Sequence, residues 1–308
     1  MKPGIVSLKN IFATAIICFC TVVPFAAVAK NTVTTSVTST SKQAVAFIDS
    51  ITNLSPSNYW PNVKPVPFLQ NIKENVKDPI IIYAGSGTNF CGYGALSYLI
   101  LQDDPLGYAK LMVQLYKEGK ASFGNSRFTP SAAIEKQAGR MRFKGVMDIH
   151  PADQLWFLTL ADHFKGYLNF FNRKYDPGDE DRFWASVNYA KFNRMVRSLL
   201  HYKVHPRGTD LIRPSISDLY QYISERLETG KVVLYINNRI VHKKKHEKIK
   251  LKVPTHFIVA EKISRQDDTI TLVYWDYGGR TLMQLTPKFL KRIVFGITHF
   301  TKKENGEN

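Results

Sequence analysis

Three residues of this chain, Cys91, His256 and Asp276, have the types and settings that thiol chemistry needs. Cys91 stands where the polar loop sequence GSGTNF meets the apolar sequence CGYGALSYLI, so we expect it in the first turn of a helix. The positive end of the helix dipole favours a thiolate at that place. A nucleophilic thiol also needs a base and a third group that orients the base. We predict that His256 is the base and that Asp276 orients it.

His256 and Asp276 are predicted to face each other across a hairpin. His256 begins an apolar strand over 256–263, and Asp276 ends the next strand over 269–276. A three-residue loop over 265–267 would pair residues whose numbers sum to 532, which places His256 opposite Asp276. A slip of one residue would put the two side chains on opposite faces of the sheet. In the paired arrangement the imidazole can accept a thiol proton while the acid holds its tautomer.

These motifs, taken in order, resemble a known family. A Cys-Gly pair that opens a helix, a late His-Phe-x-Val strand and an Asp-x-Gly after the next strand are similar to the papain-like cysteine peptidase superfamily. Within it the motifs resemble bacterial double-glycine leader peptidases and their exported relatives, and also the Cys-His-Asp effector proteases of bacterial pathogens. The resemblance covers residues 79–100 and 231–300. It implies a papain-like α+β fold and a thiol protease that cleaves a peptide or isopeptide amide through a Cys-His-Asp triad and an acyl-enzyme.

The chain departs from this family at the group that stabilises the oxyanion. The family places a Gln several residues before the Cys, whereas Gly85 stands six residues before Cys91 and residues 71–90 contain no Gln. Asn89 is the nearest amide, and together with the Cys91 backbone N–H it is our candidate for an oxyanion hole. Papain-like folds also host amidases, deamidases and acyltransferases, so the resemblance leaves the reaction open. A catalytically silent domain that binds an anionic partner and a peptidoglycan amidase are the alternatives, although the usual Asp-Cys-Ser motif of the amidase is absent.

The first 29 residues predict that the protein is exported, and the bacterial resemblance implies the periplasm or the medium as its destination. Lys2 and Lys9 precede an apolar run that ends in Ala27-Val28-Ala29, which is the pattern of a cleaved signal peptide. The run is also long enough for an uncleaved N-terminal membrane anchor. Residues 30–43 are rich in Thr and Ser without an apolar period, which indicates a disordered lead-in.

The charge of the chain suggests an anionic partner. Lys and Arg number 42 against 25 Asp and Glu, a formal net charge of +17. Such a balance suits an envelope polymer, a membrane surface or nucleic acid, of which we do not expect nucleic acid here. The alternative is a basic exported protein whose charge has no specific target. Lys243, Lys244 and Lys245 belong to the densest basic run, residues 242–252, which either guides an anionic substrate or forms a solvated hairpin. We expect no metal and no cofactor, because the His pairs spaced four apart lack a third ligand.

The rest of the chain predicts one α+β domain over residues 44–303. Its first part carries the nucleophile helix and an enlarged helical insertion over about 102–229, where apolar residues recur at three- and four-residue spacing. The period then changes to that of an antiparallel sheet. We expect strands over 79–83, 231–237, 256–263, 269–276, 280–285 and 294–300, and a short helix after Thr286.

Overall fold

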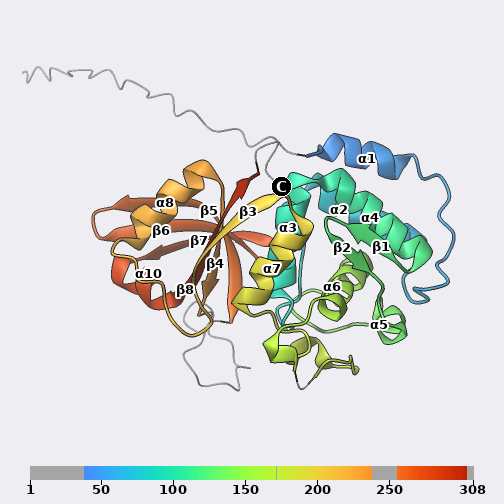
Figure 1. Ribbon diagram of the computed structural model, residues 1–308. Coiled ribbons are helices and arrows are strands. Elements are labelled where there is room, and N and C mark those ends of the chain that lie inside the picture. Colours follow the sequence, from blue (N-terminus) through green and yellow to red (C-terminus); the bar gives the residue numbers. More distant parts are fainter. Residues whose placement is uncertain (1–37, 171, 238–254, 304–308) are drawn as a thin grey trace, which may run out of the picture. The chain divides into compact units, whose positions relative to one another are not determined.

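The main feature of the fold is a six-stranded antiparallel sheet (Figure 1). This computed structural model describes residues 38–170, 172–237 and 255–303. The strand order is β3-β8-β4-β5-β6-β7, and a separate hairpin pairs β1 with β2. The predicted α+β class is therefore confirmed. The strands are β1 Ala121–Phe123, β2 Ser126–Phe128, β3 Tyr202–Gly208, β4 Lys231–Ile236, β5 His256–Gln266, β6 Thr269–Asp276, β7 Gly279–Leu285 and β8 Val294–Lys302.

Helices cover both faces of the sheet (Figure 1). On one face, α8 (Leu219–Thr229) and α10 (Pro287–Ile293) pack their apolar residues against Ile258 and Leu272 of the sheet. On the other face lie α3 (Cys91–Asp103) and α7 (Tyr189–Leu199). Phe192 of α7 stacks on Phe257 of β5 with ring centroids 4.5 Å apart. The sheet therefore has an apolar core on each side, as the alternation of its strands requires.

Helix α3 is the central helix of the fold, because the sheet packs on one of its sides and further helices pack on the other. Twelve of its thirteen residues are buried, which explains why the sequence is apolar all round rather than on one stripe. The helices outside it are α1 Ser41–Asp49, α2 Pro65–Lys77, α4 Pro105–Glu118, α5 Ala132–Gln137 and α6 Pro151–His163, and short 3-10 turns occupy Pro79–Ile81, Tyr167–Asn169 and Asp179–Asp181.

A buried polar network ties α2 to α6 beside this helix. The Asp153 carboxylate accepts hydrogen bonds from Asn75 Nδ2 at 2.6 Å and from Asn71 Nδ2 at 3.3 Å. Burial raises the pKa of Asp153 to about 6, against the hydrogen bonds and the nearby His150, which lower it. The network satisfies polar groups that would otherwise be costly in the core.

Two boundary predictions at the start of the domain were wrong. The predicted lead-in over 30–43 is too long, because α1 begins at Ser41, where Thr40 and Gln43 form a capping box. Residues 79–83 are not a strand. Pro79–Ile81 form a 3-10 turn, and the Asp78 side chain accepts from the Ile80 backbone N–H. At both places a side chain accepts a hydrogen bond from a backbone N–H group, and this capping determines the local backbone structure.

The insertion over 102–229 is less helical than predicted. It contains the β1-β2 hairpin and strand β3, which pairs with β8 at the edge of the main sheet. Strand β3 carries Pro206 and three positively charged or His residues, so it has no apolar alternation that would reveal it in the sequence. Residues Asp179–Asp181 form only a 3-10 turn, and the next helix of the insertion begins at Tyr189.

The N-terminal prediction lies outside the described residues, because these begin at Thr38. All described residues belong to one compact unit. Within the described ranges no helix has both the length and the apolar character that crossing a membrane requires.

Candidate active site

The first turn of α3 places Cys91 beside the start of β5. The Cys91 Sγ lies 3.6 Å from the backbone oxygen of Thr255, the residue before His256. The thiol is nearly buried, with 9 % of the residue exposed. Phe90 stands at the N-cap and offers no side-chain cap to the helix. The sequence motif at residues 85–100 therefore folds as predicted, with the thiol at the positive end of a helix.

His256 and Asp276 form a buried pair. His256 Nε2 and Asp276 Oδ1 are 2.6 Å apart, and the two residues are 1 % and 6 % exposed. Burial lowers the pKa of His256, but Asp276 and the hydrogen-bonded Cys91 side chain outweigh it and raise this pKa to about 9. The imidazole is therefore protonated at neutral pH, between a carboxylate on one side and a thiol on the other. The structure brings together all three residues that we selected from the sequence.

The register that joins the pair differs from the predicted one. The β5-β6 turn has two residues, since Gln266 pairs with Thr269, and a bulge follows between Ala260 and Lys262. Beyond the bulge Val259 pairs with Trp275. The two-residue turn alone would place His256 and Asp276 on opposite faces, and the extra residue of the bulge restores a common face. The prediction that His256 and Asp276 stand directly opposite each other was wrong. They share a face of the sheet and lie diagonally across the two strands.

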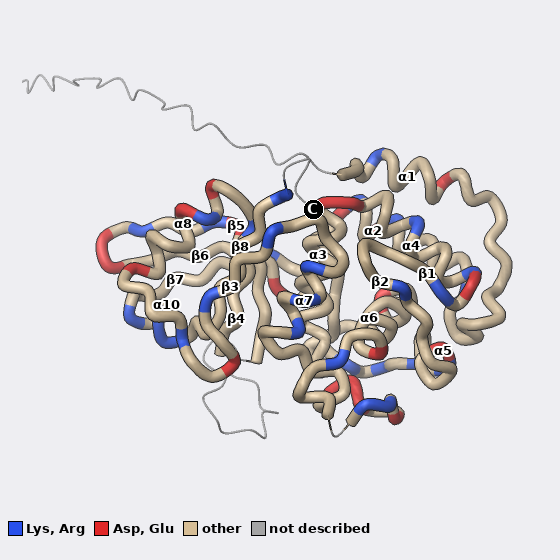
Figure 2. The backbone as a smooth tube through the Cα atoms, in the orientation of Figure 1, with Lys and Arg blue, Asp and Glu red and all other residues tan. Residues whose placement is uncertain are grey.

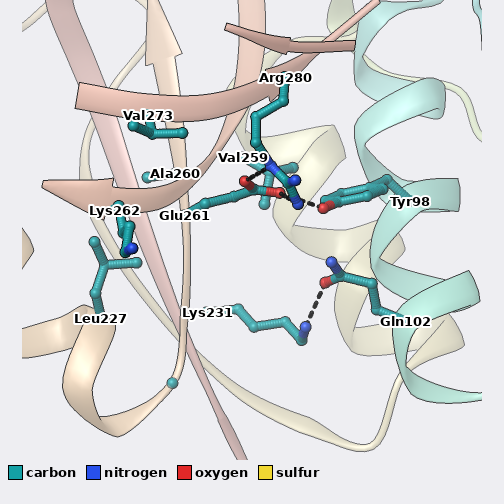
Figure 3. A pocket seen from close by; sticks show the side chains of 11 residues that line it. Tyr98, Gln102, Leu227, Lys231, Val259, Ala260, Glu261, Lys262, Val273 and Arg280 are labelled. Atoms are coloured by element: carbon teal, nitrogen blue, oxygen red, sulfur yellow. Dashed lines mark hydrogen bonds and ion pairs between the residues drawn. The ribbon is translucent and has the colours of Figure 1, made fainter. Parts of the chain in front are cut away.

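Glu261 holds this bulge against the nucleophile helix (Figure 3). Its carboxylate accepts from Tyr98 Oη at 2.5 Å and pairs with Arg280. Tyr98 also stacks on Trp275, with centroids 4.9 Å apart. Glu261, Tyr98 and Arg280 also line a surface cavity of about 620 Å³ at this level of α3, well along the helix from Cys91. Through Glu261, the helix that carries the thiol and the strand that carries the imidazole are fixed to each other.

Asn89, our candidate for the oxyanion hole, is directed toward a neighbouring segment. Its Nδ2 donates to Arg182 O at 2.9 Å and to Ser186 Oγ at 3.3 Å, and its backbone N–H donates to Glu180 O at 2.7 Å. In this arrangement Asn89 fastens the loop before Cys91. The N–H groups that remain for an oxyanion are those of the uncapped first turn of α3.

A buried lysine fastens the segment around Ser186, which Asn89 also contacts, to the first turn of α3. Lys191 Nζ lies 2.7 Å from Tyr93 Oη, 3.2 Å from Asn169 Oδ1 and 3.0 Å from Ser186 O. Burial, together with the cations Lys165 and Arg194, lowers the pKa of Lys191 to about 6. The wall beside the thiol is therefore held by an amine that is largely uncharged at neutral pH. Nothing in the sequence signals this role, because Lys191 stands in an ordinary helical pattern.

Close packing also explains the glycine that follows the thiol. A Cβ placed on Gly92 would lie 2.8 Å from Val187 Cβ, a distance that real side chains do not tolerate. The Cys-Gly pair in the motif thus permits the segment around residue 187 to approach the helix start.

Lys243, Lys244 and Lys245 lie outside the described residues, so their predicted role as a substrate guide stays a prediction.

Tyr277 is a site residue that sequence reasoning missed. Its ring stacks on the His256 imidazole, with centroids 4.6 Å apart and planes 20° apart. Tyr277 and Gly278 form the two-residue turn between β6 and β7 and have φ of 44° and 80°. Glycine or asparagine usually occupies the first of these positions, so a tyrosine there costs about 1 kcal/mol or more. The residue type was the available signal, since an aromatic side chain in such a turn needs a compensating contact.

Replacing Tyr277 by Asn should separate the effect of the stack on His256 from the effect of the backbone strain at residue 277. Asn suits the left-handed turn, so we expect the free energy of unfolding to change by no more than about 1 kcal/mol. Alkylation of Cys91 should slow several-fold, because the His256-Asp276 pair becomes open to water. Denaturant unfolding and iodoacetamide kinetics measure the two effects. If the fall in the free energy of unfolding matched the loss in alkylation rate, with both expressed as free energies, the stack would be only structural.

Comparison with family models, with curated proteins and with solved structures found no match for this chain. The function is therefore inferred from the site itself.

Proposed function

We propose that the protein is an exported cysteine hydrolase that cleaves a peptide or isopeptide amide through Cys91, His256 and Asp276. The observation that supports this proposal is the convergence of a thiol at a helix start, a buried imidazole and a buried carboxylate from three separate elements. A nucleophile, a base and an orienting acid in this order are the minimum for acyl transfer by a thiol. The papain-like resemblance of the motifs belongs to the same proposal.

The proposed reaction follows from the charges of the three groups. The Cys91 thiolate attacks the acyl carbon, and the carbonyl oxygen becomes an oxyanion at the first turn of α3. His256, held protonated, gives its proton to the leaving amine, which leaves an acyl-enzyme. Neutral His256 then takes a proton from water, which attacks the thioester and releases the acid. Asp276 keeps the imidazole oriented throughout.

Alkylation of Cys91 tests the proposal without knowledge of the substrate. Iodoacetamide and the inhibitor E-64 should label Cys91 much faster than free cysteine below pH 8, because His256 stabilises the thiolate. His256→Ala should slow labelling about 100-fold, within the range that a general base contributes. His205→Ala is the matched control, since His205 is exposed on β3. Peptide mass mapping identifies the labelled residue.

A second candidate function is a binding domain without catalysis. The engagement of the Asn89 amide with Arg182 and Ser186 favours it, because no side-chain amide is left beside the thiol at that position. This alternative predicts labelling of Cys91 at the rate of free cysteine, with or without His256. Rapid labelling that depends on His256 would exclude it.

A further inference from the structure

An exposed apolar tip stands next to the loop that leads to Cys91. Phe143 and Val146 are each 94 % exposed and Met147 is 59 % exposed. We call residues 143–147 the tip. Monomeric proteins rarely expose large apolar side chains side by side, and such patches mark surfaces for a partner or a membrane.

The backbone of the tip is held in place. Gly87 N donates to Lys144 O at 2.7 Å, and Lys144 Nζ pairs with Glu180 at 3.3 Å. Phe143 N donates to Asp148 Oδ1 at 2.8 Å, although Phe143 has φ of 58°. A phenylalanine in the left-handed region is strained. Its side chain has almost no contact within the chain that could offset this strain, so the compensating contact is expected from outside the molecule.

The chain segment that carries the tip is basic. Arg140, Arg142 and Lys144 stand against Asp148 on the link between α5 and α6, a local net charge of +2 over residues 140–148 (Figure 2). Arg142 pairs with Asp148 at 3.5 Å while 56 % of the Arg142 side chain stays exposed. Apolar side chains that protrude between cations suit the surface of an anionic bilayer, where the apolar groups enter the acyl region and the cations meet lipid phosphates.

We propose that the tip, residues 143–147 with Arg140 and Arg142, inserts into an anionic lipid surface. Side chains that are 94 % exposed protrude rather than line a groove, so a fluid bilayer suits them better than a peptide or a folded partner. Insertion would place the loop over 85–91, and with it the thiol, next to the lipid surface. The proposal goes beyond the hydrolase activity and does not depend on it.

The four tryptophans of the chain make a direct test possible. Trp60, Trp156, Trp184 and Trp275 are at most 2 % exposed, so a tryptophan at the tip would be the only one that lipid can reach among the described residues. The full-length chain with Phe143→Trp is mixed with vesicles of phosphatidylglycerol and phosphatidylcholine in which the acyl chains are brominated. Bromine quenches only a tryptophan that enters the acyl region. Leu282→Trp is the matched control, because Leu282 is 61 % exposed on β7, away from the tip.

We expect the emission of the tryptophan introduced by Phe143→Trp to shift to the blue and to be quenched in the anionic vesicles, and the Leu282→Trp protein to show neither change. Adding Arg140→Gln and Arg142→Gln should lower the ratio of inserted to free tips about 30-fold, since each cation near an anionic surface contributes about a factor of five. Absence of quenching, equal quenching in pure phosphatidylcholine, or equal quenching of the control would each overturn the proposal. Because no outcome involves alkylation of Cys91, failure here leaves the proposed hydrolase chemistry to its own test.

Discussion

Replacing Asp276 by Ala should reduce the rate of Cys91 alkylation at pH 7 by about 100-fold, within the range that an oriented base contributes. The substitution leaves the imidazole buried without the carboxylate that holds its proton and its orientation. His256, 1 % exposed, then loses its charge at neutral pH, and the thiol loses the cation that favours its ionised form. We expect this to be the largest effect of any substitution that leaves the thiol and the imidazole in place.

Asp276→Asn distinguishes the two roles of the carboxylate. An amide oxygen can still accept from His256 Nε2, so orientation is kept while the charge is removed. We expect a loss of about 10-fold, intermediate between the wild-type protein and Asp276→Ala. Asp267→Asn is the matched control, because Asp267 lies in the left-handed region, with φ of 52°, at the other end of the same hairpin. Wild-type alkylation of the Asp276→Ala protein would contradict the assignment of an orienting acid.

The contribution of His256 to the free energy of unfolding should fall by about 3 kcal/mol as the pH rises from 6.5 to 9, at about 1.4 kcal/mol for each pKa unit. The pKa of His256 is raised from 6.5 to about 9 in the folded chain, against the burial that lowers it, by Asp276 and Cys91. The folded state therefore binds the proton more tightly than the unfolded state. Its stabilising contribution is complete below pH 6.5 and is lost as the pH passes 9.

Denaturant unfolding at a series of pH values measures this slope. Because Lys191 and other groups also titrate, the informative quantity is the difference between the wild-type protein and Asp276→Asn. That difference should shrink as the pH approaches 9, since His256 is neutral in both proteins at high pH. A difference that is constant, or that grows with pH, would show that the carboxylate does not hold a proton on the imidazole.

Local signals in the sequence identified the three site residues. A polar loop before an apolar helix predicted the position of Cys91, and His256 and Asp276 were found because each stands at the end of an apolar strand. The Thr286 cap before α10 was predicted from the same kind of signal and is confirmed by its bond from Phe289 N. Such features depend on neighbours in the chain, so they can be read without the fold.

Contacts between distant segments could not be predicted in the same way. Strand β3 forms only because β8 offers it a partner, and its own residues have no strand pattern. The bulge at Glu261 depends on Tyr98 and Arg280, which come from α3 and β7. The role of Asn89 depends on Arg182 and Ser186, about a hundred residues later.

The sequence by itself determined which residue types stand at the ends of which elements: a thiol at a helix start, an imidazole at a strand start and a carboxylate at a strand end. The tertiary structure decided how these meet, because a two-residue turn and a bulge set the face on which His256 and Asp276 lie. It also decided that Tyr277 covers the imidazole and that Lys191 holds the wall beside the thiol. The physical reason is that end signals are local, whereas register and burial depend on which distant residues pack together.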